Sequence, residues 1–306
     1  MAISAQDVKT LREMTGCGMM DCKKALTEAD GNMDKAIEIL REKGLAASAK
    51  KAGRIAAEGA AYAAVMDGIG VVVEVNAETD FVGKNEKFVD FVKGVAATVA
   101  ACNPADLDAL MECRYAGSDN TVLAQQQEMV LVIGENIKVR RFERFEGGFS
   151  VPYIHAGGKI GVLVNLEVEG GIDATEIGRD IAMQIAALNP RFWDKSQVTE
   201  DVLAEEKKIM LVQMDNDPNM ASKPAQVKEK IVEGKINKFY SENCLLQQDF
   251  VKDNELTVEK YIATAAKALG GTVTFKKAVR FEKGEGIEKK QENFAEEIAK
   301  TLGKES

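Results

Sequence analysis

A strand-then-helix pattern that occurs twice is the feature that most constrains the fold of this chain. In the first copy, alternate apolar residues over 69–75 are typical of a half-buried strand, and an apolar stripe of helical period follows over 88–100. In the second copy, residues 159–165 resemble 68–74, and residues 180–190 resemble 94–104. The sequence therefore predicts a duplicated α+β unit at the centre of the chain.

Three short helices are predicted ahead of the first unit, because apolar residues recur at helical spacing between glycine breaks. Asn32 is the predicted N-cap of the third helix, and Gly44, which follows Lys43, is its predicted end. Residues 45–58 are rich in alanine, which gives them good helix propensity, but they are poor in bulky apolar side chains, so they are predicted to form a linker. The basic residues in this stretch indicate a solvated helix face: Lys50, Lys51 and Arg54.

The second half of the chain contains a predicted antiparallel helical pair between about Val198 and Tyr240, with a break at 215–219. A strand pair is predicted at 272–275 and 278–281, and a terminal helix is predicted from Phe294 onward. The fold class that follows is α+β, multi-domain and multi-lobed.

Composition limits the partners that this chain can bind. Its 306 residues are 45% apolar and 29% charged, which is enough to bury two or more cores. The formal net charge of −9 repels phosphate backbones, so no direct nucleic-acid partner is expected. No run of about eighteen uncharged apolar residues occurs, and residues 1–4 lack the start of a signal peptide, so no membrane partner is expected either.

The five cysteines follow no paired or metal-ligand spacing: Cys17, Cys22, Cys102, Cys113 and Cys244. This pattern predicts free thiols in a reducing compartment and therefore a cytoplasmic protein. No phosphate loop is present, and a single histidine cannot form a histidine metal cluster. Nucleophile motifs are also missing. We therefore expect no cofactor, no metal and no covalent chemistry.

One segment remains as a candidate site: Thr79, Asp80, Phe81 and Val82, which lie between the predicted strand and helix of the first unit. One interpretation is structural, with Thr79 or Asp80 capping the helix and Phe81 folded into the core. The other is that Phe81 projects from a strand–helix corner and anchors a partner. The residue pattern leaves both open.

Seven segments of the chain carry recognisable sequence signatures. They are Val8–Leu11 with Arg12, Thr15-Gly16-Cys17-Gly18-Met19-Met20-Asp21-Cys22-Lys23-Lys24-Ala25-Leu26, Thr79-Asp80-Phe81-Val82, Ile133-Gly134-Glu135-Asn136-Ile137, Tyr153-Ile154-His155-Ala156-Gly157-Gly158, Lys159 to Val164, and Glu229 to Lys235. These segments resemble signatures of the elongation factor Ts family, whose members are guanine-nucleotide exchange factors for elongation factor Tu. The resemblance covers the whole chain, with small departures at Ala77, Gly83 and Lys159.

The resemblance also implies a domain organisation. It predicts a ubiquitin-associated-like three-helix module over 1–55, duplicated core lobes and a protruding helical pair that serves as a dimerisation arm. The predicted ranges are 56–148 for the N lobe, 149–192 with 267–286 for the C lobe, 193–266 for the arm and 287–306 for a C-terminal helical module.

The resemblance assigns roles to individual residues. Asp80 and Phe81, flanked by Thr79 and Val82, would enter the GTPase domain of elongation factor Tu in its GDP-bound or nucleotide-free form, and would disturb the magnesium and phosphate site so that GDP leaves and GTP can bind. Further contacts would come from Arg12, Met19, Met20 and His155. A homodimer and a 2:2 complex with the partner are both left open.

Purely structural roles are also possible for these residues. Met19 and Met20 are also typical of core-filling positions at a helix start, and His155 of a polar residue in a loop.

The whole chain could instead be an adaptor whose three-helix module binds a ubiquitin-like or ribosomal partner. A third reading is an enzyme with Cys22 or Cys102 as nucleophile, for which no nearby histidine exists in the sequence.

Overall fold

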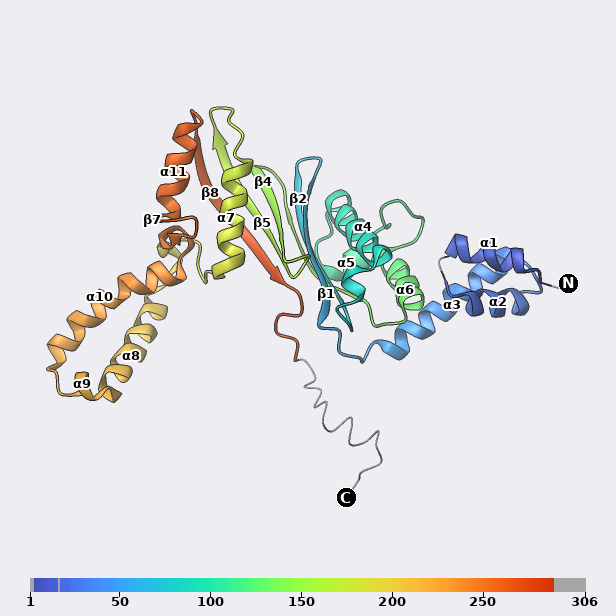
Figure 1. Cartoon of the computed structure of the whole chain (residues 1–306), viewed down its shortest axis with the longest axis horizontal. Coiled ribbons are helices and arrows are strands. Elements are labelled where there is room, and N and C mark those ends of the chain that lie inside the picture. The colour runs from blue at the N-terminus through green and yellow to red at the C-terminus, as the bar shows by residue number, and fades with distance from the viewer. Residues whose placement is uncertain (1–2, 16, 289–306) are drawn as a thin grey trace, which may run out of the picture.

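The computed structural model describes residues 3–15 and 17–288 and shows a multi-domain molecule that mixes helices and sheets (Figure 1). Two three-stranded sheets form its centre, with a three-helix cluster at one end and a long helical pair at the other. The α+β, multi-domain fold class predicted from the sequence is confirmed. The predicted terminal helix at 294–302 lies outside the described residues.

The N-terminal cluster consists of α1 (Ala5–Thr15), α2 (Met19–Glu28) and α3 (Met33–Lys51). Leu11, Leu26 and Leu40 are buried between these helices and form a small core of their own. The predicted cap is confirmed, because the Asn32 side chain accepts a hydrogen bond from the Lys35 N–H at 3.0 Å. The cluster packs on α6 (Val122–Ile133) through α3.

Gly44 does not end α3. The helix propensity predicted for the stretch after it is confirmed over 45–51, but these residues continue α3 and do not form a separate linker. The helix continues to Lys51, and only residues 52–57 connect it to the first strand. A Cβ atom on Gly44 would lie 3.3 Å from the carbonyl oxygen of Gln127 in α6. The glycine and the small residues after it therefore allow two helices to approach closely, which the local sequence could not reveal.

The two central sheets are antiparallel, and each carries helices on its outer face (Figure 1). The first sheet has the order β1-β2-β3, with β1 (Glu58–Met66), β2 (Ile69–Ala77) and β3 (Lys138–Phe145), and lies against α4 (Glu86–Cys102), α5 (Leu107–Glu112) and α6. The second has the order β4-β5-β8, with β4 (Phe149–His155), β5 (Ile160–Glu169) and β8 (Thr272–Glu282), and lies against α7 (Thr175–Leu188) and α11 (Val258–Ala268). The strand pair predicted at 272–281 is one continuous strand.

The inner faces of the two sheets pack against each other, so β2 is buried on both faces rather than on one. Val71 and Val73 belong to the core under α4, whereas Val72 meets Leu163 of the second sheet. A Cβ atom on Gly161 would lie 3.3 Å from the Val72 side chain, so glycine sets the close spacing here. The prediction of a half-buried strand was wrong because the second sheet covers the face that the sequence leaves to solvent.

Glu74 is the one acidic residue of β2, and its side chain is fully buried beside the second sheet. Its carboxylate accepts hydrogen bonds from Arg140 Nη1 at 2.9 Å, Arg141 Nε at 2.5 Å, the Asn76 amide at 3.0 Å and the Gly284 N–H at 2.7 Å. Burial would raise the pKa of Glu74, but these four donors together lower it below its ordinary value. One charge thus joins β2, β3 and the segment after β8.

The predicted antiparallel helical pair is present as a projecting arm, residues 200–243 (Figure 1). Asp217 and Pro218 interrupt it where the break was predicted, and Phe239 is buried near its base. The arm contains α8 (Glu200–Asn216), α9 (Pro218–Ala221) and α10 (Ala225–Asn243). The remaining short elements are η1 (Val82–Lys84), η2 (Lys195–Gln197), η3 (Leu245–Gln247), β6 (Asp249–Phe250) and β7 (Asp253–Thr257).

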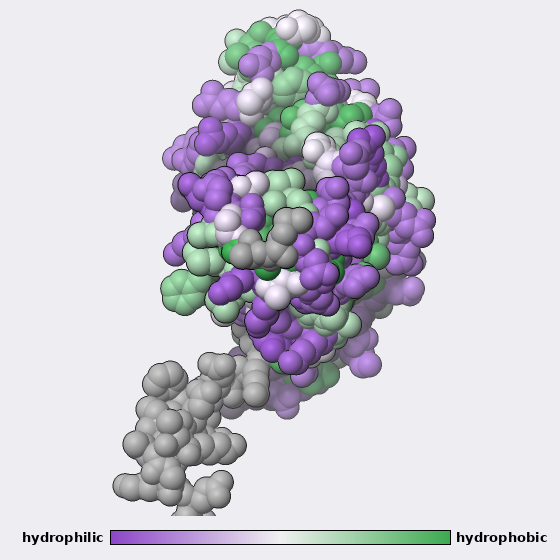
Figure 2. All heavy atoms as spheres, turned by 90° about the vertical axis from the view of Figure 1, so that its right-hand side faces the viewer, coloured by the Kyte–Doolittle hydropathy of each residue, from purple (hydrophilic) through white to green (hydrophobic). Residues whose placement is uncertain are grey.

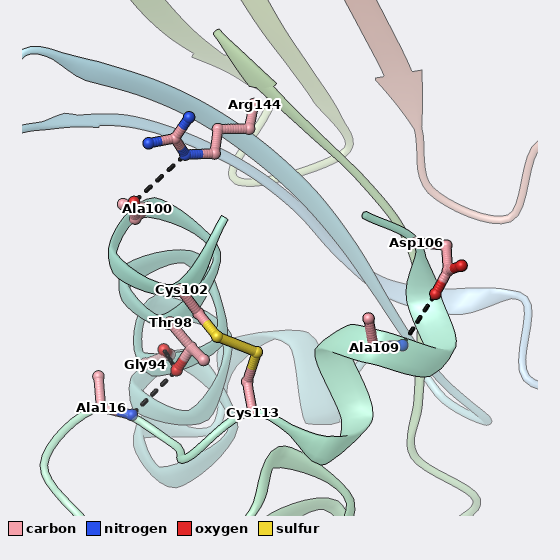
Figure 3. The surroundings of a disulfide bond; sticks show 9 residues. All are labelled: Gly94, Thr98, Ala100, Cys102, Asp106, Ala109, Cys113, Ala116 and Arg144. Carbon is pink, nitrogen blue, oxygen red and sulfur yellow. Dashed lines mark hydrogen bonds between the residues drawn. A yellow bond between two sulfur atoms is a disulfide. The ribbon is translucent and has the colours of Figure 1, made fainter. Parts of the chain in front are cut away.

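Two of the five cysteines form a disulfide, which corrects the prediction that all are free thiols. Cys102 ends α4 and Cys113 follows α5, so the bond closes the loop that connects these helices (Figure 3). The other three cysteines are free and buried. Cysteine spacing alone missed the bond because the two sulfur atoms meet only when α4 and α5 pack together. The cysteines consequently no longer argue for a reducing compartment.

Glu74→Gln is expected to destabilise the protein at neutral pH by about 3 kcal/mol, because it removes a fully buried carboxylate that faces two guanidinium groups. The folded-state pKa is depressed, so the stabilisation is present above the ordinary value of 4.5 and is lost as the pH falls through the folded-state pKa. Chemical denaturation at a series of pH values measures both effects.

The matched control is Glu146→Gln, which removes an exposed carboxylate from its ion pair with Arg144 and should change stability by less than about 1 kcal/mol. If Glu74→Gln and the unmodified protein lost stability in parallel below about pH 5, the carboxylate would not be the charge that holds the sheets together.

Candidate partner-binding site

The segment 78–85 forms the corner between β2 and α4. β2 ends at Ala77, the 3₁₀ turn η1 spans Val82–Lys84, and α4 begins at Glu86. The helix is capped by Asn85, whose side chain accepts from the Lys87 N–H at 3.0 Å. The predicted capping role of Thr79 or Asp80 is therefore wrong, and these residues lie ahead of the cap on the exposed part of the corner.

Phe81 projects from this corner with 81% of its surface exposed. The interpretation that it folds into the core is wrong. Its neighbour Val82 is 6% exposed and packs into the core of the first sheet, so two adjacent apolar residues point in opposite directions. The Phe81 backbone is helical, with φ −60° and ψ −37°, and its carbonyl accepts from the Lys84 N–H at 3.2 Å. A large apolar ring is thus displayed on a hydrogen-bonded turn.

The N-terminal cluster brings two more of the predicted residues to this place. Arg12 of α1 and Met19 of α2 line the same open cavity, of about 580 Å³, as Phe81 and Val82. The remaining walls were not identified from the sequence and come from Cys17, Gly18, Asn85, Lys87, Val132 and Ile133. Of these, Cys17, Gly18 and Ile133 lie in segments that resemble the family signatures, and that resemblance was the signal that could have found them.

Met19 and Met20 are 59% and 61% exposed, so the core-filling alternative for both is wrong. Met20 does not line the cavity of Phe81. It borders a neighbouring hollow of about 450 Å³ whose rim carries Lys23, Lys24 and Lys43. Figure 2 views this end of the molecule and shows apolar patches within a largely hydrophilic surface.

His155 lies apart from the cavity, at the end of β4, where its side chain is exposed. Its Nδ1 atom is 3.0 Å from the Tyr153 hydroxyl. The turn that follows is held against β1, because the Ala61 N–H donates to the Gly158 carbonyl at 2.8 Å. A Cβ atom on Gly83, in the corner of Phe81, would lie 2.9 Å from the carbonyl oxygen of Gly59. Both exposed segments therefore meet the first residues of the same strand.

The chemistry of this region is that of a contact surface. Burial raises the pKa of the Cys17 thiol at the cavity wall, which keeps it protonated at neutral pH. Cys22 is buried, and the sulfur of Cys102 is bonded to Cys113, so neither is presented as a nucleophile. Within residues 3–15 and 17–288, no cluster of three or more His, Cys, Asp or Glu could hold a metal ion, and no helix has the length and apolarity needed to span a membrane.

An exposed aromatic ring on a tethered turn, beside an open cavity with methionine and arginine in its walls, is typical of proteins that act by docking onto another macromolecule. Comparison with known proteins identifies the family. The family model described as Elongation factor TS matches residues 78–285. The chain belongs to the elongation factor Ts family.

Full-length relatives support the same assignment. The chain is 48% identical to Elongation factor Ts of Syntrophotalea carbinolica, an alignment that covers 98% of this chain and 99% of that protein. It is 49% identical to Elongation factor Ts of Clostridium perfringens strain SM101, over 99% of this chain and all of that protein. Family membership makes it a translation elongation factor of the nucleotide-exchange type.

Phe81→Ala is expected to leave the free energy of unfolding within about 0.5 kcal/mol of its original value, because the ring makes little buried contact. Val82→Ala, at the next position, should lower it by roughly 2 kcal/mol, since it removes two buried methyl groups. Thermal and denaturant unfolding of the two variants compare the positions directly. Equal losses would mean that the Phe81 ring is packed and not displayed.

Proposed function

We propose that this chain promotes GDP release from elongation factor Tu by inserting Asp80 and Phe81 into its GTPase domain, where they disturb the magnesium and phosphate site. The observation that carries this proposal is the exposure of Phe81 on a tethered corner, in a chain that belongs to the elongation factor Ts family. A rigid exposed ring loses little conformational freedom when it enters a pocket, so it suits the role of an anchor.

The proposed mechanism is a coupling of binding energies. Binding of the factor weakens the binding of GDP, and thermodynamic linkage requires that GDP weaken the binding of the factor by the same ratio. An acceleration of release by about a thousandfold corresponds to roughly 4 kcal/mol. The factor makes or breaks no covalent bond, so we infer that it is not an enzyme in the covalent sense and needs no cofactor of its own.

The other predicted contacts are proposed to extend the same interface. Arg12 and Met19 share the cavity of Phe81, and Met20 lies beside it, which supports contact of all three with the GTPase domain. His155 is proposed to contact a different domain of the partner. The support is that its turn and the corner of Phe81 both lie against the start of β1, so both are held at one end of the paired sheets.

We also propose the domain organisation of the family for this chain. A ubiquitin-associated-like module over 1–55 is supported by the separate core of α1, α2 and α3. Duplicated lobes over 56–148 and over 149–192 with 267–286 are supported by their matching order of strands and covering helices. The arm is assigned to 193–266 and the C-terminal module to 287–306. A cytoplasmic location follows from the proposed partner.

The arm is proposed to mediate self-association, either as a homodimer or within a 2:2 complex. Ile209 and Val212 on α8 and Val227 on α10 are exposed, although the helices of a solvated arm would ordinarily keep such residues inside. A second copy of the arm would cover these side chains.

The central test is a fluorescent-GDP release assay with purified elongation factor Tu. Phe81→Ala is expected to lower the stimulated release rate by at least about tenfold, because the anchor is lost while the fold stays intact. Phe81→Leu should retain part of the activity. The matched control is Leu269→Ala, because Leu269 is another exposed large apolar residue, at the end of α11. This variant should stimulate GDP release from elongation factor Tu at the original rate.

Full stimulation by Phe81→Ala would overturn the anchoring role. Binding to elongation factor Tu without any stimulated release, by the unmodified protein, would instead favour the adaptor alternative.

Analytical ultracentrifugation tests the arm. A variant with Ile209→Glu and Val212→Glu should sediment as a monomer under conditions in which the unmodified protein self-associates, because charges would replace the covered apolar surface. Lys208→Glu, on the same helix, serves as a charge control. Identical sedimentation of the unmodified protein and the double variant would contradict a dimer built on this face.

A further inference from the structure

We infer that Glu135 is a positioning residue for nucleotide exchange, because its carboxylate fixes the corner that displays Asp80 and Phe81. This inference rests on the proposed function and adds a residue to it. Glu135 belongs to the segment Ile133-Gly134-Glu135-Asn136-Ile137, which resembles a signature of the family. Its hydrogen bonds indicate what this segment does.

The Glu135 carboxylate makes three hydrogen bonds to the segment just before Phe81. Its Oε2 atom accepts from the backbone N–H of Glu78 at 3.0 Å and from that of Thr79 at 2.9 Å. Its Oε1 atom accepts from the Thr79 hydroxyl at 2.7 Å. A single side chain, distant in sequence, therefore accepts hydrogen bonds from two successive backbone N–H groups of the corner and from one side-chain hydroxyl.

The contact is reciprocal. Glu78 Oε1 accepts from the backbone N–H of Asn136 at 2.6 Å, so each of the two segments donates to a carboxylate of the other. The Asn136 amide in turn donates to the Arg54 carbonyl at 2.8 Å, and Arg54 lies 3.5 Å from the Glu78 carboxylate. The end of β2 is thus tied both to the end of α6 and to the connection that leads from α3.

Local backbone geometry places Glu135 where it can reach the corner. α6 ends at Ile133, and Gly134 adopts the left-handed conformation with φ 85°, which turns the chain sharply away from the helix axis. The following residue then points toward the end of β2. Any residue other than glycine is disfavoured at this φ, so the sequence Gly134-Glu135 acts as a unit.

The hydrogen bonds of Glu135 matter because the exposed ring of Phe81 has little packing that would fix its position. Val82 anchors the corner on the C-terminal side of Phe81 by entering the core. On the N-terminal side, Thr79 and Asp80 are exposed, and the hydrogen bonds to Glu135 are what restrain the backbone there. Without them, binding of a partner would have to order the corner, and this entropic cost would slow exchange.

The test uses full-length Glu135→Ala and the isosteric Glu135→Gln in the fluorescent-GDP release assay, with Glu143→Ala on β3 as a control for the loss of an exposed glutamate. We expect Glu135→Ala to lower kcat/KM for exchange by at least about tenfold. The kcat/KM of Glu135→Gln should lie between those of Glu135→Ala and the unmodified protein, since the glutamine side chain keeps one of the two acceptor oxygens. Amide hydrogen exchange at residues 78 and 79 should become faster in Glu135→Ala and stay unchanged in Glu143→Ala.

A mutant cycle with the Asp80→Ala, Phe81→Ala variant separates positioning from other roles. If Glu135 acts by positioning these two side chains, then adding Glu135→Ala to that variant should change the release rate by less than about twofold. Independent effects that multiply would overturn the inference and indicate either direct contact with the partner or a general loss of stability. Should Glu135→Ala unfold, the same cycle is carried out with Glu135→Gln.

Two failures can be told apart. If Phe81→Ala slows release but Glu135→Ala does not, this inference is wrong and the proposed function stands. If Phe81→Ala itself has no effect, both are wrong.

Discussion

The buried carboxylate of Glu74 is the contact on which the arrangement of the two sheets depends. It receives hydrogen bonds from β3 and from the segment after β8, so one negative charge lies where three parts of the chain converge. A buried charge with missing partners is costly, and the three parts must therefore stay together for any of them to be stable. The corner of Phe81 and the turn after His155 both lie against the first residues of β1, the strand that pairs with the strand of Glu74.

Stability and recognition are assigned to neighbouring residues in the corner. Val82 contributes to the core, whereas Phe81 faces solvent and contributes almost nothing to it. The hydrogen bonds on the other side of Phe81 are polar and need no apolar burial. A binding surface of this kind can change its apolar ring without disturbing the sheet below, because the supports of the ring lie on either side of it in the chain.

Local signals predicted the elements that local physics controls, such as the cap at Asn32 and the break of the arm at Pro218. Features that depend on distant segments were missed. Gly44 resembles a helix end unless the closeness of α6 is known, and the face of β2 that carries Glu74 resembles a solvated face unless the second sheet is known. For Phe81 the residue pattern left core and surface both open, and only the family resemblance favoured the exposed position that the structure shows.

The length of the uninterrupted α3 also fixes how the N-terminal cluster is oriented on the rest of the molecule. Its 19 residues span about 28 Å, and Gly44 seats it on α6 at one fixed point along that length. Inserting a single residue between Leu40 and Gly44 would rotate the N-terminal cluster by about 100° relative to that seat. Arg12 and Met19 would then leave the cavity that they share with Phe81, although the contacts among α1, α2 and α3 would persist. The geometry of the surface is therefore encoded in the length of a helix that does not itself line the cavity.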